Sequence, residues 1–323
     1  MNSDWQSAAD LQALKARAEL LARLRYFFTE RSVLEVDVPA LARAAVTDPH
    51  IDSISAEVCG EPLYLQTSPE FFMKRLLASG SGDIYSLNKA FRNGEAGRKH
   101  NPEFTMLEWY RVGWSDHQLM DEVAQLIGEC VTLESTTKLS YRELFVQQLG
   151  IDPHAADAES LKKLALKYGE FDWADDAQGE TIAARDLWLD VLMTHVIEPQ
   201  MSKGLTLVYN FPASQAALAR IEKDEAGIDV ARRFEAYVGG VELANGYWEL
   251  CDGEEQAKRF EADLAQRKAM NLPSYPCDQN LVAALNSGMP ECAGVALGVD
   301  RLLMLASGCD DIRKLLAFPF ERV

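Results

Sequence analysis

The order of strand-like and helix-like segments is the feature that most constrains the fold of this 323-residue chain. Strand patterns occupy residues 83–92 and 104–112 and return at 205–209 and 234–250, after a segment at 116–200 that is rich in Leu, Ala, Asp and Glu. Strands and helices therefore do not alternate regularly, as they would in a doubly wound parallel sheet. This order predicts one discontinuous α+β domain over the whole chain, with 116–200 as a helical insertion.

Two further segments have clear local patterns. Apolar residues recur at helical spacing over residues 11–28, and Ser7 with Asp10 can cap that helix. Val33, Val36 and Val38 then predict a strand over residues 33–38 that is closed by Pro39.

Residues 62–78 predict a strand, a cap and a helix. Residues 63–65 are strand-like, Ser68 is a good N-cap, and Pro69 fits the first helical position. We therefore expect the helix to begin directly after Ser68.

Charge excludes several classes of partner. The chain has 32 Lys and Arg against 50 Asp and Glu, which gives a formal net charge of −18. This excess repels phosphate backbones, so it argues against sequence-independent binding to DNA or RNA and against binding to anionic membranes. No apolar run approaches the roughly 20 residues of a membrane span, and residues 1–10 contain no signal-peptide core.

Cysteines and histidines are sparse. None of the six cysteines forms a CxxC pair, and the five histidines have neither HExxH nor HxxxH spacing. We therefore expect no disulfide framework and no zinc site, and a reduced cytoplasmic compartment is favoured. A GxxxxGK[ST] phosphate-binding loop is also absent from the sequence.

Residues 91–110 predict a long hairpin with cations at one end. Arg92 ends the first strand, and the loop that follows contains Arg, Lys and His at 98–100. Guanidinium forks match phosphate oxygens. Glu108 and Tyr110 are two residues apart, so they share a face of the return strand. The alternative is a surface hairpin with ordinary charged side chains.

Residues 235–250 predict a second hairpin that presents carboxylates. A tight turn at Gly239-Gly240 puts Tyr237 opposite Glu242, and Glu235 then lies on the same face as Glu242, diagonally across. Carboxylates this close repel each other unless a cation lies between them, and Mg²⁺ that carries nucleotide phosphates is the natural candidate. The alternative is two solvated glutamates on an edge ribbon.

The next polar residues of this hairpin have the opposite parity. Asn245, Tyr247 and Glu249 would come beside Glu242 only if a bulge occurred near Gly246. The sequence does not establish such a bulge.

Residues 294–305 predict a strand of small residues followed by a helix. The small side chains allow a backbone or a flat ring to approach closely. Asp300 lies in the first helical turn, and Arg301 projects near the helix start, where it could meet a phosphate or a base. The alternative is a glycine-containing strand packed against a core helix.

Together these stretches resemble the catalytic domain of a class II aminoacyl-tRNA synthetase, and its lysyl branch most of all. Pro39 matches the proline of motif 1, residues 91–110 match motif 2, and residues 294–301 match motif 3. Residues 100–106 and 242–246 are specific signals, and the match runs from about residue 15 to the C-terminus. The resemblance implies an antiparallel β-sheet flanked by helices, in a homodimer whose interface contains the motif 1 proline.

The chain also resembles a stand-alone branch of this family, the ligases that attach (R)-β-lysine to elongation factor P. Motif 1 begins within the first 40 residues, so we expect no anticodon-binding domain. Residues 66–70 and 211–215 match this branch, as does Ala296, where lysyl enzymes carry glycine. A methyl group there would shift the substrate backbone, and one methylene is worth about 1–3 kcal/mol of selectivity.

This resemblance implies an ATP-dependent reaction with Mg²⁺. A lysine-like amino acid attacks the α-phosphate of ATP to give an aminoacyl-adenylate, and a lysine amine of elongation factor P then takes the aminoacyl group. Arg92 and Arg301 are the implied catalytic residues, and Glu235 and Glu242 the implied Mg²⁺ ligands. The residues implied for ATP binding are Arg92, Asn93, Gly94, His100, Asn101, Glu242, Leu243, Gly298 and Arg301. The residues implied for amino-acid binding are Ser68, Pro69, Glu70, Glu108, Tyr110, Asn245, Glu249 and Ala296. Among them, Tyr110 and Glu249 are expected to meet the distal ammonium.

One position departs from the family pattern. Motif 2 has a glutamate directed at the adenine amino group where this chain has Gly94, and Glu95 could replace it if the loop shifts by one residue. Two other functions stay open. The first is a tRNA-charging lysyl enzyme without its anticodon domain, against which the net charge argues. The second is a catalytically silent regulatory or binding protein, which Gly94 favours and the complete set of charged site residues disfavours.

Overall fold

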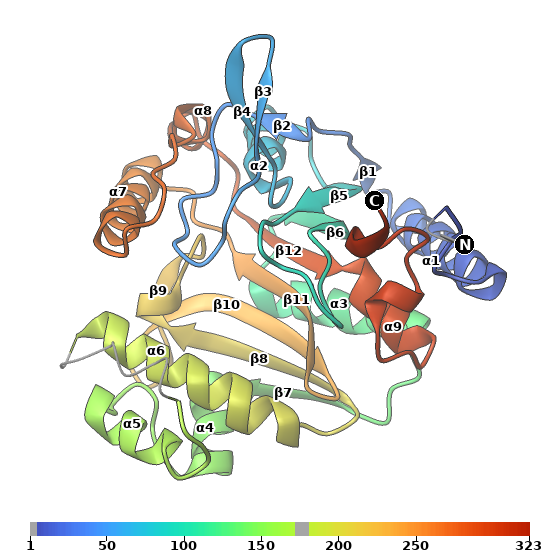
Figure 1. The fold of residues 1–323 in the computed structure, drawn as a ribbon. Helices are drawn as coiled ribbons and strands as arrows, with labels where there is room; N and C mark the ends of the chain where they lie inside the picture. The colour runs from blue at the N-terminus through green and yellow to red at the C-terminus, as the bar shows by residue number, and fades with distance from the viewer. Residues whose placement is uncertain (1–4, 172–180) are drawn as a thin grey trace. The chain divides into compact units, whose positions relative to one another are not determined.

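The computed structural model describes residues 5–171 and 181–323 (Figure 1). The described chain falls into two compact units. The first unit contains Met1–Thr132 and Glu249–Val323, and the second contains Leu133–Trp248. Within the described ranges, no helix is both long and apolar enough to cross a membrane. All six cysteines lie in these ranges, and none of them forms a disulfide there.

Strands of the first unit form two sets. Four of them pair in the order β1 (Leu34–Glu35), β5 (Ile84–Phe91), β6 (Glu103–Val112) and β12 (Cys292–Gly298). β1 is parallel to β5, and the other two pairs are antiparallel. The strands β2 (Leu41–Ala42), β4 (Glu61–Leu65) and β3 (Ser55–Val58) form a smaller antiparallel sheet. The strands predicted at 83–92 and 104–112 are confirmed to within one residue at each end.

Helices of the first unit pack around these strands. They are α1 (Leu11–Glu30), α2 (Glu70–Ala78), α3 (Asp116–Cys130), α7 (Gly253–Ala269), α8 (Gln279–Asn286) and α9 (Val299–Ala306), with short 3₁₀ turns η5 (Ile312–Lys314) and η6 (Phe320–Arg322). The predicted cap is confirmed, because the Asp10 carboxylate accepts the Ala13 N–H at 2.8 Å. Phe28 of α1 stacks on Tyr85 at a centroid distance of 4.4 Å and meets Trp109 edge-on at 5.4 Å. Buried aromatic rings therefore anchor α1 to the β5–β6 pair.

The predicted cap of α2 is wrong. Ser68 does not cap the helix; Pro69 takes that position, and the helix begins at Glu70. The Pro69 carbonyl accepts the N–H groups of Phe72 and Met73 at 3.2 and 3.0 Å. Proline has a fixed φ and needs no N–H partner, so it starts the helix without a side-chain cap.

The strand predicted over residues 33–38 is also shorter than expected. Only Leu34 and Glu35 are in β1, and the last bond toward β5 is from the Val36 N–H to the Tyr85 carbonyl at 2.8 Å. Pro39 has no N–H and cannot extend the ladder.

The described part of the second unit contains five further strands that pair with one another. Their order is β11 (Val241–Trp248), β10 (Asp229–Val238), β8 (Leu205–Pro212) and β7 (Thr136–Ser140), and β9 (Ile221–Lys223) also pairs with β10. The β7–β8 pair is parallel and the others are antiparallel. Figure 1 shows the helices α4 (Tyr141–Leu149), α5 (Ala158–Ala165) and α6 (Ile182–Leu192) grouped together beside these strands. α6 continues into a π-helical turn, η2 (Met193–Ile197), and a 3₁₀ turn, η3 (Glu198–Gln200), and the 3₁₀ turn η4 (Ala213–Gln215) follows β8.

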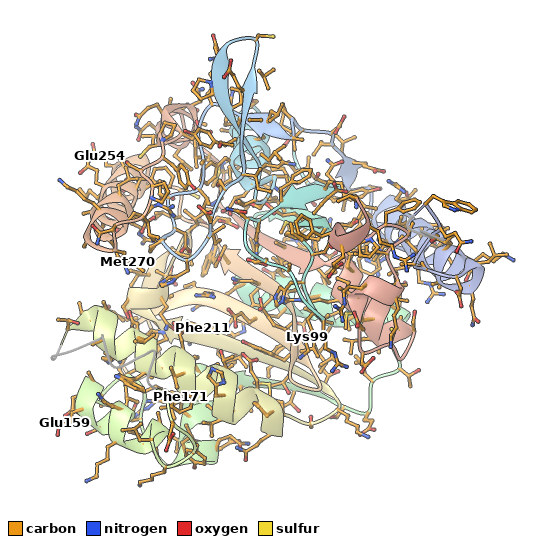
Figure 2. All side chains as sticks on the ribbon, viewed as in Figure 1. Lys99, Glu159, Phe171, Phe211, Glu254 and Met270 are labelled. Carbon is orange, nitrogen blue, oxygen red and sulfur yellow. The ribbon has the colours of Figure 1, made fainter. Side chains whose placement is uncertain are left out.

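An apolar cluster forms the core of the second unit. Phe171 and Phe211, both labelled in Figure 2, belong to it together with Trp188 of α6. The segment 116–200 is mostly helical where it is described, as predicted, although β7 interrupts it. That this segment is an insertion in a single domain stays a prediction.

Candidate active site

A cluster of ionisable side chains is buried inside the first unit. Glu70 and Lys74 come from α2, Glu108 and Tyr110 come from β6, and Glu249 is the first residue after β11. All except Glu70 are at most 2% exposed. We call these five residues the ionic cluster; it combines three carboxyl groups with one ammonium group and one phenol.

Lys74 joins two carboxylates of the ionic cluster. Its Nζ lies 2.7 Å from Oε1 of Glu70 and 2.7 Å from Oε2 of Glu249. Burial disfavours the charged ammonium, but the charges of Glu249 and then Glu70 outweigh burial and raise the pKa of Lys74. Lys74 is therefore a cation throughout the physiological pH range. Lys74 was not predicted from the sequence as a site residue, although Glu70 and Lys74 have the i, i+4 spacing of a helical ion pair.

Glu108 is held by Tyr110, whose hydroxyl donates to Oε1 of Glu108 at 2.7 Å. The other oxygen, Oε2, is buried and has no hydrogen-bond partner among the described residues. Burial, followed by repulsion from Glu70, raises the pKa of Glu108 well above its ordinary value, and the bond from Tyr110 offsets only part of this. A buried polar oxygen without a hydrogen-bond partner costs free energy. This oxygen therefore points to a bound polar group.

A glycine of β12 allows the ionic cluster to close. Gly294 pairs with Tyr110 across the strands, and Ala296 pairs with Glu108. A Cβ atom at Gly294 would lie 2.3 Å from Cε1 of Tyr110 and 2.4 Å from Oε1 of Glu249. Both distances are far shorter than van der Waals contact, so only glycine fits.

Gly294→Ala is expected to destabilise the chain by about 1–3 kcal/mol, because a ring and a carboxylate must both move. Gly298→Ala is the matched control, since a Cβ there would meet only the Arg301 side chain at 3.8 Å. Denaturant unfolding of both variants measures the difference. Equal free energies of unfolding would contradict the close approach at Gly294.

Arg92 is the first residue of the hairpin loop, directly after β5. Its guanidinium lies 5.2 Å from the centroid of Phe104, and its Nη1 is 3.7 Å from Oε1 of Glu95. The backbone N–H of Arg92 donates to the Pro102 carbonyl at 2.9 Å, and this hydrogen bond closes the base of the loop. The Nε of Arg92 is buried without a hydrogen-bond partner in the described part of the chain. A half-buried guanidinium with an unused donor suits an incoming anion.

The loop that follows has its own backbone requirement. Gly94 has a φ of +77°, in the left-handed region that favours glycine. The backbone therefore accounts for glycine where the family pattern has glutamate. The Asn93 amide donates to the Asp52 carboxylate at 2.7 Å. Lys99, labelled in Figure 2, is exposed in the same loop. That Glu95 reaches a nucleotide base stays a prediction.

His100 and Arg301 meet, although they come from distant parts of the chain. Arg301 Nη2 lies 2.6 Å from His100 Nε2. His100 as a residue is exposed, yet partial burial of its imidazole and then the Arg301 charge lower its pKa. A neutral imidazole accepts the hydrogen bond from Arg301. Asn101 is held differently, because it donates to the Glu103 carbonyl at 2.7 Å and accepts from the Phe320 N–H at 2.9 Å.

Asp300 fixes the start of α9, from which Arg301 projects. Its carboxylate accepts the Thr105 N–H at 2.6 Å and forms an ion pair with Arg17 of α1. Asp300 lies in the first helical turn as predicted from the sequence, whereas these partners were not predicted. They tie Arg301 to β6 and to α1.

The β10–β11 hairpin of the second unit has the predicted turn. Gly239 and Gly240 both have positive φ, and Tyr237 pairs with Glu242 as expected.

Beyond this pair the register shifts, so that β11 carries Leu243 as an extra residue. Asn245 then lies directly opposite Glu235. Residues opposite each other share a face, and Glu235 and Tyr237 share a face because they are two apart on β10. Glu242 and Asn245 therefore lie on the same side of the hairpin. A bulge that brings Asn245 beside Glu242 is thus present, at Leu243 and not near Gly246.

Glu235 is the centre of a hydrogen-bonded network in this unit. It accepts hydrogen bonds from Arg233 and from the Tyr237 hydroxyl. Arg233 also donates to the Gln215 carbonyl at 3.0 Å and to Oδ1 of Asn245 at 3.3 Å. In the described ranges no group of three or more His, Cys, Asp or Glu residues is placed to hold a metal ion. A cation on this face would therefore need further ligands from a substrate.

Comparison with known proteins decides the family. The family model for tRNA synthetases class II (D, K and N) matches residues 3–322. The chain belongs to the class II tRNA synthetase family. Curated relatives from Vibrio cholerae and Vibrio atlanticus are 50% and 48% identical, over 99% and 100% of both chains. One from Photorhabdus laumondii is 48% identical over 99% of this chain and 98% of its own. All three are named elongation factor P–(R)-β-lysine ligase.

Membership of the class II synthetase family confirms the fold class expected from motifs 1 to 3. In the first unit the structure brings together four of the residues predicted to bind the amino-acid substrate, namely Glu70, Glu108, Tyr110 and Glu249. In the second unit Glu235 and Asn245 share one network, whereas the Leu243 side chain is buried at 3% exposure. Arg17, Lys74, Arg233 and Gly294 were not predicted from the sequence as site residues.

Proposed function

We propose that the chain is an ATP-dependent ligase that activates (R)-β-lysine and transfers it to a lysine side chain of elongation factor P. The ionic cluster carries this proposal, because Glu70 and Glu249 share the single ammonium of Lys74 and Glu108 has a buried oxygen without a hydrogen-bond partner in the described structure. Buried carboxylates require a cation. An amino acid with a second ammonium group supplies one, and the relatives named above are ligases for such a substrate.

In the proposed first step, a carboxylate oxygen of the amino acid attacks the α-phosphorus of ATP, and pyrophosphate leaves. Arg92 binds the α-phosphate and stabilises the charge that develops there. His100 contacts ATP, and Arg301 lies near the base and the γ-phosphate. The remaining nucleotide contacts come from Asn93, Gly94, Asn101, Glu242, Leu243 and Gly298.

In the second step, a lysine amine of elongation factor P attacks the carbonyl carbon of the adenylate, and AMP leaves. No covalent bond to the enzyme forms in either step. Catalysis therefore consists of positioning and electrostatic stabilisation.

Glu235 and Glu242 fit Mg²⁺ by their chemistry, since they present two carboxylates on one face of the hairpin. Mg²⁺ binds proteins through one or two carboxylates and takes its other ligands from water and phosphate oxygens. Bound Mg²⁺ would neutralise phosphate charge. Arg233 and Tyr237 hold the Glu235 carboxylate in a fixed orientation for this role.

Tyr110 and Glu249 are the proposed partners of the distal ammonium, with Glu108 behind Tyr110. Ser68, Pro69, Glu70 and Asn245 complete the amino-acid contacts. Ala296 pairs with Glu108, so its methyl group lies on the face of β12 that carries Gly294.

Ala296→Gly is expected to shift the preference from (R)-β-lysine toward α-lysine by about tenfold or more, because one methylene is worth about 1–3 kcal/mol. The measurement is kcat/KM for each isomer in the variant and in the natural chain. An unchanged ratio would contradict a selective role for this methyl group.

The remaining parts of the proposal concern partners and location. We propose a homodimer with Pro39 at its interface and a cytoplasmic location, in keeping with six cysteines that form no disulfide within the described ranges. The net charge of −18 disfavours tRNA, DNA and anionic membranes as partners.

Pyrophosphate exchange into ATP tests the first step directly, with α-lysine and (R)-β-lysine compared. Exchange that favours (R)-β-lysine would support the ligase. Exchange with α-lysine alone would favour a tRNA-charging enzyme, and no exchange with either isomer would favour a silent regulatory protein.

A further inference from the structure

We infer that Lys74 is a positioning residue for substrate selection, an internal counter-ion that holds Glu70 and Glu249 in place and leaves the ionic cluster one further ammonium to bind. The inference rests on the proposed function and adds to it a residue that acts through the carboxylates.

The contacts of Lys74 show how it positions these groups. One Nζ atom lies 2.7 Å from a carboxylate oxygen on its own helix and 2.7 Å from one on Glu249, in a different segment of the unit. Lys74 is 0% exposed, so solvent cannot replace either partner. Two carboxylates this close would repel each other without the ammonium. Lys74 therefore determines where Glu249 stands relative to Gly294 and Tyr110.

The charges of the ionic cluster explain why one more cation is accepted. Lys74 faces Glu249, Glu70 and Glu108, and Tyr110 faces the same three carboxyl groups. Burial and these carboxylates raise the pKa of Tyr110, so it stays a neutral donor. Glu70 and Glu249 with Lys74 carry one net negative charge, and burial favours the protonated form of Glu108. One substrate ammonium brings this charge to zero.

Lysine suits this position better than arginine would. Its ammonium is a compact point charge with three donors, which two carboxylates from different directions can share. An arginine fork would instead favour one carboxylate in a planar, two-bond arrangement.

Lys74→Met removes the ammonium and keeps most of the buried stem. Arg75→Met is the matched control, because it removes a half-buried cation from the adjacent position, where the guanidinium lies 5.3 Å from the Phe72 ring centroid. In pyrophosphate exchange, Lys74→Met is expected to raise the KM for (R)-β-lysine about tenfold or more. The KM for ATP and kcat stay within about threefold, and Arg75→Met leaves all three values near those of the natural chain.

The pH dependence separates a counter-ion from a merely structural lysine. Without Lys74, the buried Glu249 carboxyl is expected to take up a proton, and its protonated form does not attract an ammonium. The KM of Lys74→Met relative to the natural chain should therefore fall as pH rises from about 6 to 9. The inference would be overturned if the KM values of Lys74→Met and the natural chain differed by less than about threefold. It would also be overturned if the KM of Lys74→Met were raised by a factor that does not change with pH.

Thermal unfolding gives a readout that needs no substrate. A carboxyl whose pKa is raised in the folded state stabilises the fold less as pH rises through that pKa. Lys74 itself stays charged below about pH 10 in both states. The Tm difference between the natural chain and Lys74→Met should therefore grow from pH 5 to pH 8. A constant difference would overturn the inference. Should Lys74→Met fail to fold, Lys74→Gln removes the same charge and keeps a hydrogen-bond donor.

The two measurements together distinguish the inference from the proposed function. If the natural chain shows no lysine-dependent exchange while the Tm difference grows with pH, the proposed function fails and the counter-ion is supported. If exchange occurs and the Tm difference is constant, the proposed function stands and the inference is overturned.

Discussion

Arg92→Ala is expected to lower the rate of lysine-dependent pyrophosphate exchange by about 10³-fold or more. Removal of a single donor to a developing oxyanion lowers kcat by about 10²–10³, and an arginine at a transferred phosphoryl group contributes more to the rate. The Arg92 guanidinium is half-buried, and its Nε has no hydrogen-bond partner among the described residues. Arg92→Lys keeps the charge but loses the fork, so an intermediate rate is expected. The measurement is kcat at saturating ATP and amino acid.

Arg98→Ala is the control for this loop. Arg98 is 64% exposed and pairs on the surface with Asp310. Its removal should change the rate by less than about threefold. If Arg92→Ala kept more than a tenth of the activity, or if Arg98→Ala lost as much, the assignment of Arg92 to the α-phosphate would be wrong.

Glu249→Gln is expected to lower kcat/KM for (R)-β-lysine by about 10²-fold or more, because removal of one partner of a buried ion pair leaves the other without compensation. Two ammonium groups depend on this carboxylate, that of Lys74 at 2.7 Å and the proposed substrate ammonium. The amide has nearly the same shape, so the loss reports charge and not volume. Steady-state exchange at varied amino-acid concentration gives the value.

Glu254→Gln controls for the loss of a carboxylate as such. Glu254, labelled in Figure 2, is an exposed residue in the first turn of α7. Neither its removal nor that of Glu249 should change the KM for ATP. A matching loss of kcat/KM in both variants would show that Glu249 has no special role.

Local sequence predicts most of the described secondary structure. β5 and β6 begin and end within one residue of their predicted bounds, and Asp10 caps α1 as expected. Errors arise where two local signals compete or where a partner segment decides. Pro69 displaces Ser68 as the cap of α2, and the length of β1 depends on how far it pairs with β5.

The site is predicted less completely, because its geometry depends on contacts between distant segments. Parity alone puts Glu108 and Tyr110 on one face, while resemblance to the family supplied Glu70 and Glu249. The bulge at Leu243 comes from the register of β10 against β11, which no single segment encodes.

Two further features need three-dimensional contacts. Lys74 is recognisable from sequence as a helical partner of Glu70, but its second bond to Glu249 is not. The glycine at position 94 reads as a departure from the family until its positive φ shows that the loop backbone favours it.

Intact-mass spectrometry of elongation factor P tests the proposed transfer of the aminoacyl group to that acceptor. Purified chain would be incubated with ATP, (R)-β-lysine and unmodified elongation factor P, and a parallel reaction would contain tRNA. We predict that elongation factor P gains the mass of one β-lysyl group, that the gain requires ATP and Arg92, and that tRNA is not charged. An unmodified elongation factor P after lysine-dependent adenylate formation, or charging of tRNA in its place, would contradict the proposed ligase function.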